Sequence, residues 1–544
     1  MNLNIELTIP SYLKRSFDKY PNNPFLGFTD EVAFTYSEVE QKINTTIANL
    51  ENCGIKPGDK VAILSNNMPN WGITYFAITS MGAIAVPILP DFNSAEIQNI
   101  MEHSEAKAIF VAGILASKIE DLKTDYLTTI VSINYFELVK STIIDKFDLT
   151  ISPKRTYTVS ESDIAVIIYT SGTTGNSKGV MLSHKNLMFN AKQSGILQPI
   201  FEKDVFLSFL PLSHAYENTL GLLLPMQNGA SVYYLRKLPT PAILLPALEQ
   251  VKPSIMLSVP LIIEKIYRNK IMPTINSKKI TKLLYKIPAT RKVLNAAAGR
   301  KLMKSFGGNI RFFGIGGAKL DSVVERFLLE AKFPYAIGYG LTETSPLIAG
   351  VNPQTVRLNS TGPAIEDIEL KLIDINPATG EGEICVKGDM VMQGYYKEPE
   401  KTKEVLTADG WFKTGDLATM DIDGFLFVKG RCKNVIVGSS GENIYPEEIE
   451  SVINNFEFVL ESLVIEEKGR LVAMVHLNME ELEKKYKNVK VELDDKIEEL
   501  KHDLLIYINS NVNKFSFIKA ITIHKTPFEK TPTQKIKRYK YYTK

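Results

Sequence analysis

DIAVIIYTSGTTGNSKGVMLSHKNLMFNAK, residues 163–192, is the stretch that decides the fold. Its first eight residues are almost entirely apolar and β-branched, which predicts a buried strand. A loop of glycines and hydroxyl side chains follows, and residues 183–192 are typical of a helix. Such a loop can turn its N–H groups toward phosphate oxygens at the end of a strand, which favours an anion-binding site. The candidate binding residues are Thr170, Ser171, Gly172, Thr173, Thr174, Gly175 and Lys178.

Two familiar phosphate-binding patterns do not fit this chain. A Walker A loop has glycine directly before its lysine, whereas Lys178 follows Ser177. The sequence GIGG at residues 314–317 lacks the third glycine of the dinucleotide fingerprint, because Lys319 stands there. The sequence therefore predicts a phosphate-binding loop of a third kind.

On both sides of this loop the chain alternates between predicted strands and helices. Residues 61–67 and 106–113 are short β-rich runs, and residues 71–88 combine an apolar helix with a strand. Further units follow at residues 231–236 and 254–260. This alternation is typical of an α/β protein with parallel sheets.

The pattern changes after about residue 355. Short alternating runs separated by Gly, Pro and Asp predict a small antiparallel β region at about 355–431. The last ~110 residues mix short strands with a charged helix at 492–512, and their number suits a separate small α+β domain.

Composition and charge limit the possible functions. The 544 residues carry 63 Lys+Arg and 61 Asp+Glu, a net charge of +2, so we expect no nucleic-acid partner. The scattered Cys53, Cys385 and Cys432 predict neither a disulfide framework nor a zinc site. Without a visible leader or an apolar run of ~18 residues, a cytoplasmic protein is expected.

Six further motifs, together with the loop, carry a resemblance to a known family. In the same order along the chain, they are similar to the motifs of the AMP-forming adenylating enzymes, which include acyl-CoA synthetases, luciferases and peptide-synthetase adenylation domains. The motifs are YGLTETSP (339–346), STGP (360–363), GWFKTGDL (410–417), GRCKNVI (430–436), SSGENIYPEEIE (439–450) and KTPTQKIKR (530–538).

The resemblance implies the domain organisation. It implies a large N-terminal α/β domain, residues 1–431, with two α/β sheets and the small β region. A small mobile α+β lid, residues 432–544, completes this multidomain fold. Lys433 stands at the family's hinge position between the two parts.

The resemblance also implies how ATP and magnesium are bound. Glu343 and Thr170 are the expected Mg²⁺ ligands, since magnesium prefers one or two carboxylates together with phosphate oxygens. Thr342 is expected to contact the α-phosphate, and Tyr339 to stack on adenine. The expected nucleotide contacts also include Gly316, Gly317, Ala318 and Gly340.

For the remaining motif residues, the resemblance implies contacts with the ribose, the reacting groups and coenzyme A. Asp416 and Arg431 are the expected ribose clamp, and Lys535 the cation that stabilises the charge developed during adenylation. Gln534 stands before that lysine, where the family has glycine. Gly441 is expected to line the path of coenzyme A once the lid has turned.

LPLSHAYE, residues 210–217, favours the long-chain acyl-CoA synthetase branch. His214 is expected beside the incoming carboxylate, and this stretch offers no aspartate where amino-acid-activating relatives have one. We therefore predict a long-chain fatty acid–CoA ligase. One alternative is a fatty acyl-AMP ligase that serves a carrier protein, although its usual insertion is not evident at 431–450. Another is a non-catalytic nucleotide-binding scaffold, disfavoured by the intact site residues.

Residues 265–304 hold twelve Lys or Arg residues and no Asp or Glu, with interleaved Leu, Ile and Tyr. Basic amphipathic helices of this kind bind anionic lipid headgroups, so peripheral contact with the inner face of a membrane is one hypothesis. The other is a solvated basic face without a partner.

Overall fold

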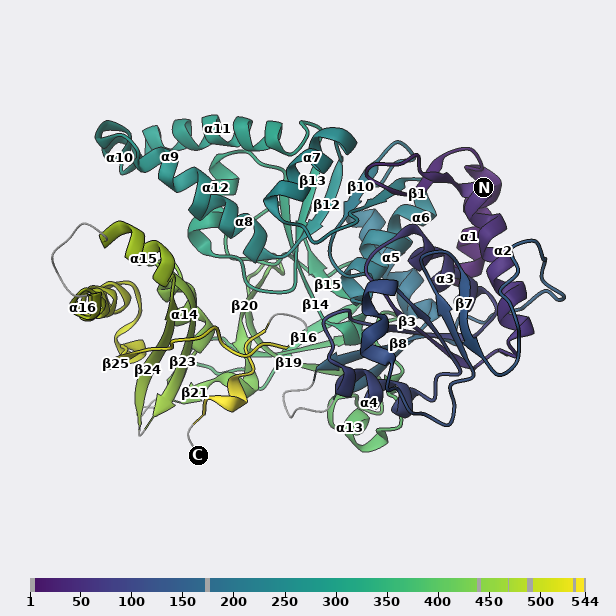
Figure 1. Cartoon of the computed structure of the whole chain (residues 1–544). Helices are drawn as coiled ribbons and strands as arrows, with labels where there is room; N and C mark the ends of the chain where they lie inside the picture. Colours follow the sequence, from purple (N-terminus) through teal and green to yellow (C-terminus); the bar gives the residue numbers. More distant parts are fainter. Residues whose placement is uncertain are drawn as a thin grey trace.

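The computed structural model describes residues 5–171, 177–437, 442–467, 469–486, 493–531 and 535–542 (Figure 1). A large α/β part contains two sheets of eight strands and one of four strands. A smaller unit at the C-terminal end contains a three-stranded sheet with its own apolar cluster. The multidomain α/β architecture expected from the sequence is confirmed.

The first eight-stranded sheet has the order β15-β14-β13-β12-β10-β11-β1-β2. Its strands from β1 to β14 in that order pair in parallel, and β15 and β2 are antiparallel at the edges. The bounds are β1 (Pro24–Phe28), β2 (Phe34–Thr35), β10 (Val205–Ser208), β11 (Ser231–Tyr234), β12 (Ile255–Ser258), β13 (Phe312–Ile315), β14 (Tyr335–Gly340) and β15 (Leu347–Gly350).

The second eight-stranded sheet has the order β18-β9-β8-β4-β3-β5-β6-β7. The strands predicted at 61–67, 106–113 and 163–170 are confirmed as β3, β5 and β8. The bounds are β3 (Lys60–Leu64), β4 (Ile84–Ile88), β5 (Ala108–Val111), β6 (Thr129–Ser132), β7 (Glu137–Ser141), β8 (Ile164–Ser171), β9 (Ser177–Ser183) and β18 (Gly394–Tyr395).

The glycine-rich stretch differs from its prediction. We expected the loop to lead directly into a helix, but residues 177–183 form strand β9, antiparallel to β8. The helix α5 begins only at His184. The sequence GVML explains the strand, since Val180 and Leu182 are buried in the core on either side of Met181, which is only partly buried.

Helices cover both large sheets. Helix α3 is apolar on all sides because it is buried between them, with Trp71, Tyr75 and Phe76 fully covered. Helices of the large part are α1 (Ile9–Lys19), α2 (Tyr36–Asn52), α3 (Pro69–Ser80), α4 (Ser94–Ser104), α5 (His184–Leu197), the π-helical η2 (Glu217–Leu223), α6 (Leu224–Asn228), α7 (Pro241–Val251), α8 (Pro260–Ile266), η3 (Tyr267–Ile271), α9 (Met272–Asn276), α10 (Lys279–Tyr285), α11 (Pro288–Ser305) and α12 (Ser322–Glu330).

The predicted small β region is confirmed as an antiparallel sheet of order β16-β17-β19-β20. The smaller unit follows it, and its charged helix is also confirmed as α16. The bounds are β16 (Glu369–Ile373), β17 (Gly382–Lys387), α13 (Pro399–Val405), β19 (Phe412–Met420), β20 (Leu426–Arg431), β21 (Ile436–Val437), β22 (Asn443–Ile444), α14 (Pro446–Ile453), β23 (Val459–Glu467), β24 (Arg470–Leu477), α15 (Met479–Tyr486), α16 (Leu493–Asn511) and β25 (Ala520–Ile523).

A small set of polar contacts docks the C-terminal unit on the large part. The Asp321 carboxylate caps α12 through the N–H groups of Val323 and Val324. Its other oxygen accepts hydrogen bonds from Asn455 and Ser451 at the end of α14. Nearby, Lys319 Nζ lies 3.0 Å from Glu448 Oε1. One aspartate thus serves both a helix and the interface.

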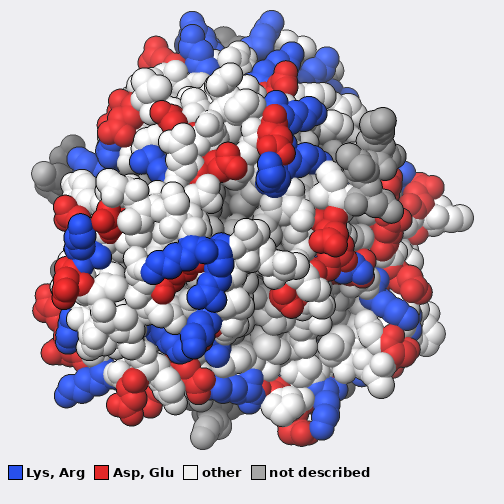
Figure 2. Space-filling view, turned by 90° about the vertical axis from the view of Figure 1, so that its right-hand side faces the viewer, with Lys and Arg blue, Asp and Glu red and all other residues white. Residues whose placement is uncertain are grey.

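The surface carries both charges. On the side formed by the N-terminal elements, basic and acidic side chains are interspersed (Figure 2). Helices α9, α10 and α11, which hold most of the basic segment 265–304, project at one end of the large part (Figure 1). No helix within the described ranges combines the length and apolarity needed to cross a bilayer.

Candidate active site

The β8–β9 hairpin fixes the two ends of the phosphate-binding loop. Thr170 and Lys178 face each other across the hairpin, one pair before its last described pair. Lys178 Nζ lies 4.7 Å from the centre of the Tyr395 ring, a cation–π distance. The loop residues expected to bind phosphate, Gly172, Thr173, Thr174 and Gly175, lie outside the described residues, as do the Ser171 side chain and Gly441.

Glu343 lies on a tight turn, η4 (Thr342–Thr344), between β14 and β15. The turn is closed so tightly that a Cβ on Gly340 would stand 1.8 Å from the carbonyl oxygen of Pro346. The Thr344 hydroxyl donates to that same oxygen at 2.6 Å, and Asn190 of α5 donates to the Leu347 carbonyl at 2.8 Å. The position of Glu343 is therefore set by backbone packing.

The Glu343 carboxylate is held by a tyrosine that sequence reasoning missed. Tyr395 of β18 donates its hydroxyl to Glu343 Oε1 at 3.0 Å. Since β18 pairs with β9, this tyrosine also joins Glu343 to the lysine side of the phosphate loop. Burial and the Glu343 charge raise the pKa of the Tyr395 hydroxyl, which keeps it a donor. The tyrosine pair in GYYKEP was the available signal.

Asp416 and Arg431 face each other on β19 and β20, and Tyr339 joins them from β14. Arg431 Nε lies 2.8 Å from Asp416 Oδ1, and the Tyr339 hydroxyl donates to Oδ2 at 2.7 Å. Burial raises the pKa of the Asp416 carboxyl, against the opposing influence of Arg431 and Tyr339. The expected ribose and adenine residues are thus brought together by direct contacts.

The loop after β13 contains Gly316, Gly317 and Ala318, and it brings Gly316 beside Tyr216. A Cβ on Gly316 would lie 3.2 Å from the Tyr216 ring, and Gly317 has a φ of +86°, which favours glycine. Tyr216 was not among the expected site residues. Tyr216 directly precedes η2, and the sequence does not show that the chain turns its side chain toward the Gly316 loop here.

Lys535 reaches the same centre from the C-terminal unit. Arg431, Asp416 and Glu343 all act on it electrostatically, and burial followed by Arg431 lowers the pKa of its ammonium group. The Lys535 residue itself is exposed to solvent. Three residues further, Arg538 pairs with the buried Glu450 of α14 and anchors this segment.

His214 lies within electrostatic reach of Lys535. Burial, with a contribution from the Lys535 charge, lowers the pKa of the His214 imidazole to about 4. The ring is therefore neutral near pH 7 and able to donate one hydrogen bond. Lys433, the expected hinge residue, is exposed in the turn that follows β20.

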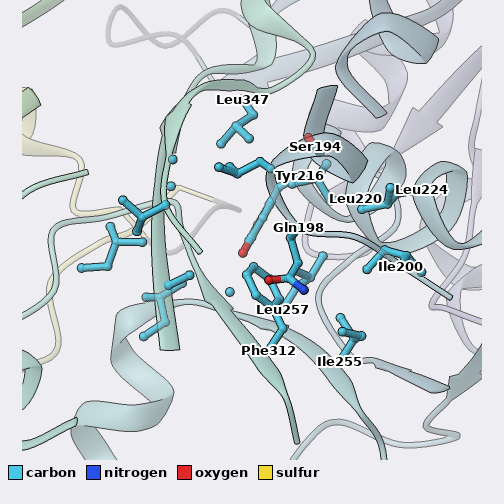
Figure 3. Close-up of a pocket in the computed structure, with 18 of the residues that line it drawn as sticks. Ser194, Gln198, Ile200, Tyr216, Leu220, Leu224, Ile255, Leu257, Phe312 and Leu347 are labelled. Carbon is cyan, nitrogen blue, oxygen red and sulfur yellow. The ribbon is translucent and has the colours of Figure 1, made fainter. Parts of the chain in front are cut away.

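An apolar cavity of about 50 Å³ lies between the first sheet, α5 and η2 (Figure 3). Tyr216, Leu220 and Leu224 line one side, and residues of β10, β12, β13 and β14 line the other. Gly314 belongs to this lining and stands two residues before the Gly316 loop. The cavity thus begins beside the charged site and continues along the sheet.

Comparison with known proteins defines the class. The family model described as AMP-binding enzyme matches residues 13–396, so the chain belongs to the AMP-binding enzyme family. Within it, the chain is 28% identical to long chain acyl-CoA synthetase 4 of Arabidopsis thaliana, over 97% of this chain and 90% of the relative. It is 26% identical to fatty acyl-CoA synthetase A of Dictyostelium discoideum, over 96% and 87%.

Solved structures confirm the fold. The structure of o-succinylbenzoate CoA synthetase from Bacillus subtilis in complex with its acyl-adenylate intermediate superimposes with a TM-score of 0.76. It covers 98% of each chain at 22% sequence identity. The two-domain fold of the adenylate-forming enzymes is therefore the fold of this chain.

Proposed function

We propose that this protein is a long-chain fatty acid–CoA ligase. The fatty acid carboxylate attacks the α-phosphorus of ATP, so that an acyl phosphate bond forms and pyrophosphate leaves. The sulfur of coenzyme A then attacks the acyl carbonyl carbon, forming the thioester and releasing AMP. Both curated relatives described above carry acyl-CoA synthetase names, and the whole-length match supports the same reaction class.

The whole-length match to acyl-CoA synthetases is the observation that carries the proposal, and the apolar cavity marks where the acyl chain would enter. The cavity begins at Tyr216 and Gly314, next to the Gly316 loop, and its lining is almost entirely aliphatic or aromatic. Burial of apolar surface stabilises binding by ~25 cal/mol per Å², so an alkyl chain gains most from such a lining. We expect the carboxylate to lie at the His214 end and the chain in the cavity.

The charged residues act at the other end of the substrate. Two anions must meet during adenylation, so Lys535 and Arg431 lower the free energy of the transition state by electrostatic stabilisation. Neutral His214 can donate a hydrogen bond to the fatty acid carboxylate. Because the ring carries no charge, it does not form an ion pair that would neutralise this nucleophile. Thr342 follows Tyr339 closely enough to share the nucleotide, and we assign it the α-phosphate.

Glu343 suits a magnesium ion. Among the described residues, no group of three or more Asp, Glu, His or Cys could hold a metal alone. A single carboxylate, with hydroxyl and phosphate oxygens completing the shell, is how Mg²⁺ is commonly held with nucleotides. Glu343, assisted by Thr170, would hold the ion, which when bound neutralises phosphate charge.

The second half-reaction needs a different arrangement of the C-terminal unit. We assign the boundary between the domains to residues 431 and 432, with Lys433 at the hinge. Gly441 would then line the coenzyme A path, where a larger side chain obstructs the pantetheine arm. These assignments rest on the resemblance of the motifs.

The test is pyrophosphate release measured with carboxylates from acetate to stearate, with and without coenzyme A. We expect the highest kcat/KM with long saturated chains, and acyl-CoA as the product. Acyl-AMP that accumulates and is transferred only to a carrier protein would replace this proposal with the carrier-protein ligase. No release with any carboxylate would support the nucleotide-binding scaffold.

We also propose peripheral contact with anionic membranes through α10 and α11. Ile280, Leu283 and Val293 are at least 66% exposed, and Lys or Arg residues flank them. Exposed apolar side chains among cations suit a lipid headgroup surface. The charge of Arg291 is already neutralised by Glu330, whose carboxylate lies 2.8 Å away.

Liposome flotation tests this contact. Binding to vesicles with phosphatidylserine should exceed binding to neutral vesicles and should weaken with salt, because exposed charges are screened beyond ~8 Å at physiological ionic strength. Ile280→Asp should also weaken binding to the phosphatidylserine vesicles. Equal, negligible binding to both vesicle types would leave a solvated basic face.

A further inference from the structure

The far end of the apolar cavity coincides with the amino ends of three parallel strands. Phe206, Ile255 and Phe312 line it, at or near the first residues of β10, β12 and β13. The nucleotide loops leave the opposite, carboxyl ends of the sheet. The lining residues of β13 run from Phe312 to Ile315, so the cavity follows this strand from its first residue to its last.

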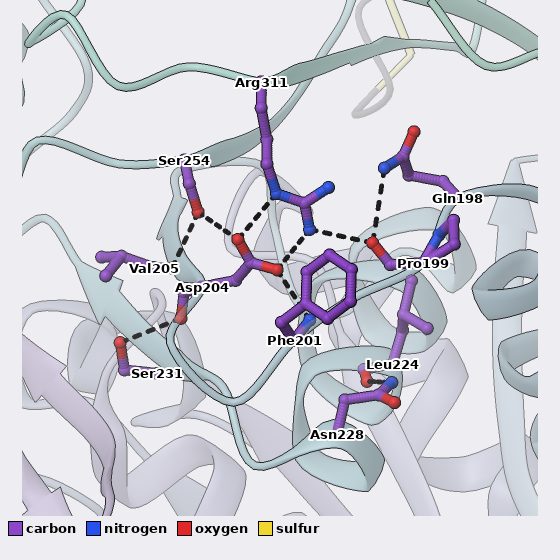
Figure 4. A network of polar contacts seen from close by, with 10 residues as sticks. All are labelled: Gln198, Pro199, Phe201, Asp204, Val205, Leu224, Asn228, Ser231, Ser254 and Arg311. Atoms are coloured by element: carbon purple, nitrogen blue, oxygen red, sulfur yellow. Dashed lines mark hydrogen bonds and ion pairs between the residues drawn. The ribbon is translucent and has the colours of Figure 1, made fainter.

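A polar network lies immediately beyond this end (Figure 4). Three of its members directly precede a cavity-lining residue in the chain: Pro199 precedes Ile200, Ser254 precedes Ile255, and Arg311 precedes Phe312. Asp204 stands two residues before Phe206. Asp204 and Arg311 are not among the residues that line the cavity, so they act on the far wall through its backbone.

Arg311 and Asp204 tie the wall together. Arg311 Nε donates to Asp204 Oδ1 at 2.8 Å, and its Nη2 donates to the Pro199 carbonyl at 2.8 Å. Asp204 also accepts from the Ser254 hydroxyl at 2.8 Å and from the Phe201 N–H at 2.7 Å. The loop between α5 and β10 is thereby fastened to β12 and β13.

The pair is strongly held. The Asp204 side chain is 4% exposed and that of Arg311 is 31% exposed. Although burial opposes it, the guanidinium, the Phe201 N–H and Ser254 together keep the pKa of the Asp204 carboxyl below its usual value. Asp204 is thus ionised at neutral pH. Its contacts, together with those of Arg311, hold the 198–201 loop in place.

We propose that Arg311 and Asp204 are positioning residues for chain-length specificity: they hold the 198–201 loop as the end wall of the acyl cavity and so limit the chain that fits. This inference rests on the proposed function. The inference goes beyond that function by assigning the limit on acyl chain length to a polar pair outside the cavity.

The experiment measures kcat/KM for a series of saturated fatty acids from octanoate to arachidate. Arg311→Leu removes both ties, and the Asp204→Asn/Arg311→Leu double variant avoids leaving a buried unpaired charge. Both should raise the ratio of arachidate to laurate kcat/KM by at least about tenfold, since room for even one more methylene in an apolar pocket is worth about 10-fold. The KM for ATP should not change.

A matched control and an opposite variant complete the test. Arg357 has the same kinds of partner, Asp421 and Asp423 at 2.7 Å and the Phe425 ring at 3.8 Å, but lies outside the cavity wall. Arg357→Leu should leave the profile unchanged. Ile200→Trp fills the far end and should reduce activity on the longest chains first.

Each outcome decides something. Unchanged chain-length profiles in folded Arg311→Leu or in the double variant would overturn the inference. If neither variant folds, an unchanged profile in Ile200→Trp overturns it equally, and the expected shortening supports it. Absence of fatty-acid-dependent pyrophosphate release in the unmodified enzyme would instead reject the proposed function.

Discussion

Asp416 and Lys535 bring opposite charges to one site, but they are held in different ways. Asp416 lies within the four-stranded sheet, and both of its oxygens are already engaged by Tyr339 and Arg431. Lys535 belongs to the C-terminal unit, which is docked through a few polar contacts such as that between Asp321 and Asn455. A residue fixed in advance suits ligand binding, whereas a residue on a separable unit suits one step of a reaction.

The largest expected effect is that of Lys535→Ala. Removing the cation that faces the developing charge costs ~3–4 kcal/mol of transition-state stabilisation, so acyl-adenylate formation should fall by about 10²–10³-fold. Supplied with synthetic acyl-AMP, the variant should still form acyl-CoA at nearly the normal rate. Pyrophosphate release and thioester formation measured separately test this.

Gly441→Leu is expected to affect the other half-reaction from the one that Lys535→Ala affects. It should preserve pyrophosphate release and block thioester formation. Equal losses of both steps in both variants would mean that rotation of the C-terminal unit does not divide the chemistry.

Glu343→Gln should come next, with an adenylation loss of about 10²-fold and an unchanged melting temperature. The amide keeps the size and one oxygen ligand but loses the charge that attracts magnesium. Raising the Mg²⁺ concentration should therefore recover part of the activity. A variant within a few-fold of the unmodified enzyme at all Mg²⁺ concentrations would remove Glu343 from the metal site.

Asp416→Asn should sharpen the contrast with Lys535, because it changes affinity more than rate. Hydrogen bonds to a charged group contribute ~1.5–3 kcal/mol, so the KM for ATP should rise by about tenfold or more. The kcat at saturating ATP should change less. The comparison would break down if Asp416→Asn lowered kcat as strongly as Lys535→Ala while leaving the KM for ATP unchanged.

Lys319→Ala is expected to have the smallest effect. Lys319 and Glu448 are both about 40% exposed, and an ion pair of this kind contributes ~0.2–1 kcal/mol. Adenylation should fall by no more than about fivefold, and thioester formation from acyl-AMP should be unaffected. A loss as large as that of Lys535→Ala would show that docking depends on this one pair.

Much of the fold could be predicted from the sequence because apolar runs and turn residues mark strands locally. Strand β9 was missed, since glycines and the short alternation of GVML do not distinguish a hairpin from a loop that enters a helix. The motif residues Tyr339, Asp416 and Arg431 do lie together in space. Their contacts could be expected only from the resemblance, because the local sequence pattern shows neither that β19 pairs with β20 nor that β14, from another sheet, lies next to them.

Residues that act through tertiary contacts gave little signal: Tyr395 had the tyrosine pair in GYYKEP, and Arg311 had none. Tyr395 contacts Glu343 across 52 positions of sequence, and Arg311 contacts Asp204 across 107. Neither residue belongs to one of the six family motifs. The role of each becomes visible only when the sheets bring it to its partner. The cavity itself has no sequence signature, since its lining comes from strands and helices spread over 158 positions between Ser194 and Val351.

The closed turn around Glu343 has a consequence for how this scaffold can be varied. Gly340 touches the Pro346 carbonyl so closely that a saturation library should yield no active replacement there, and a turn longer or shorter by one residue would carry Glu343 to another place. The metal-binding corner is therefore a fixed point for directed evolution. New substrate preferences have to be sought in the cavity wall, where the loop at 198–201 can be rebuilt without moving the acidic side chain.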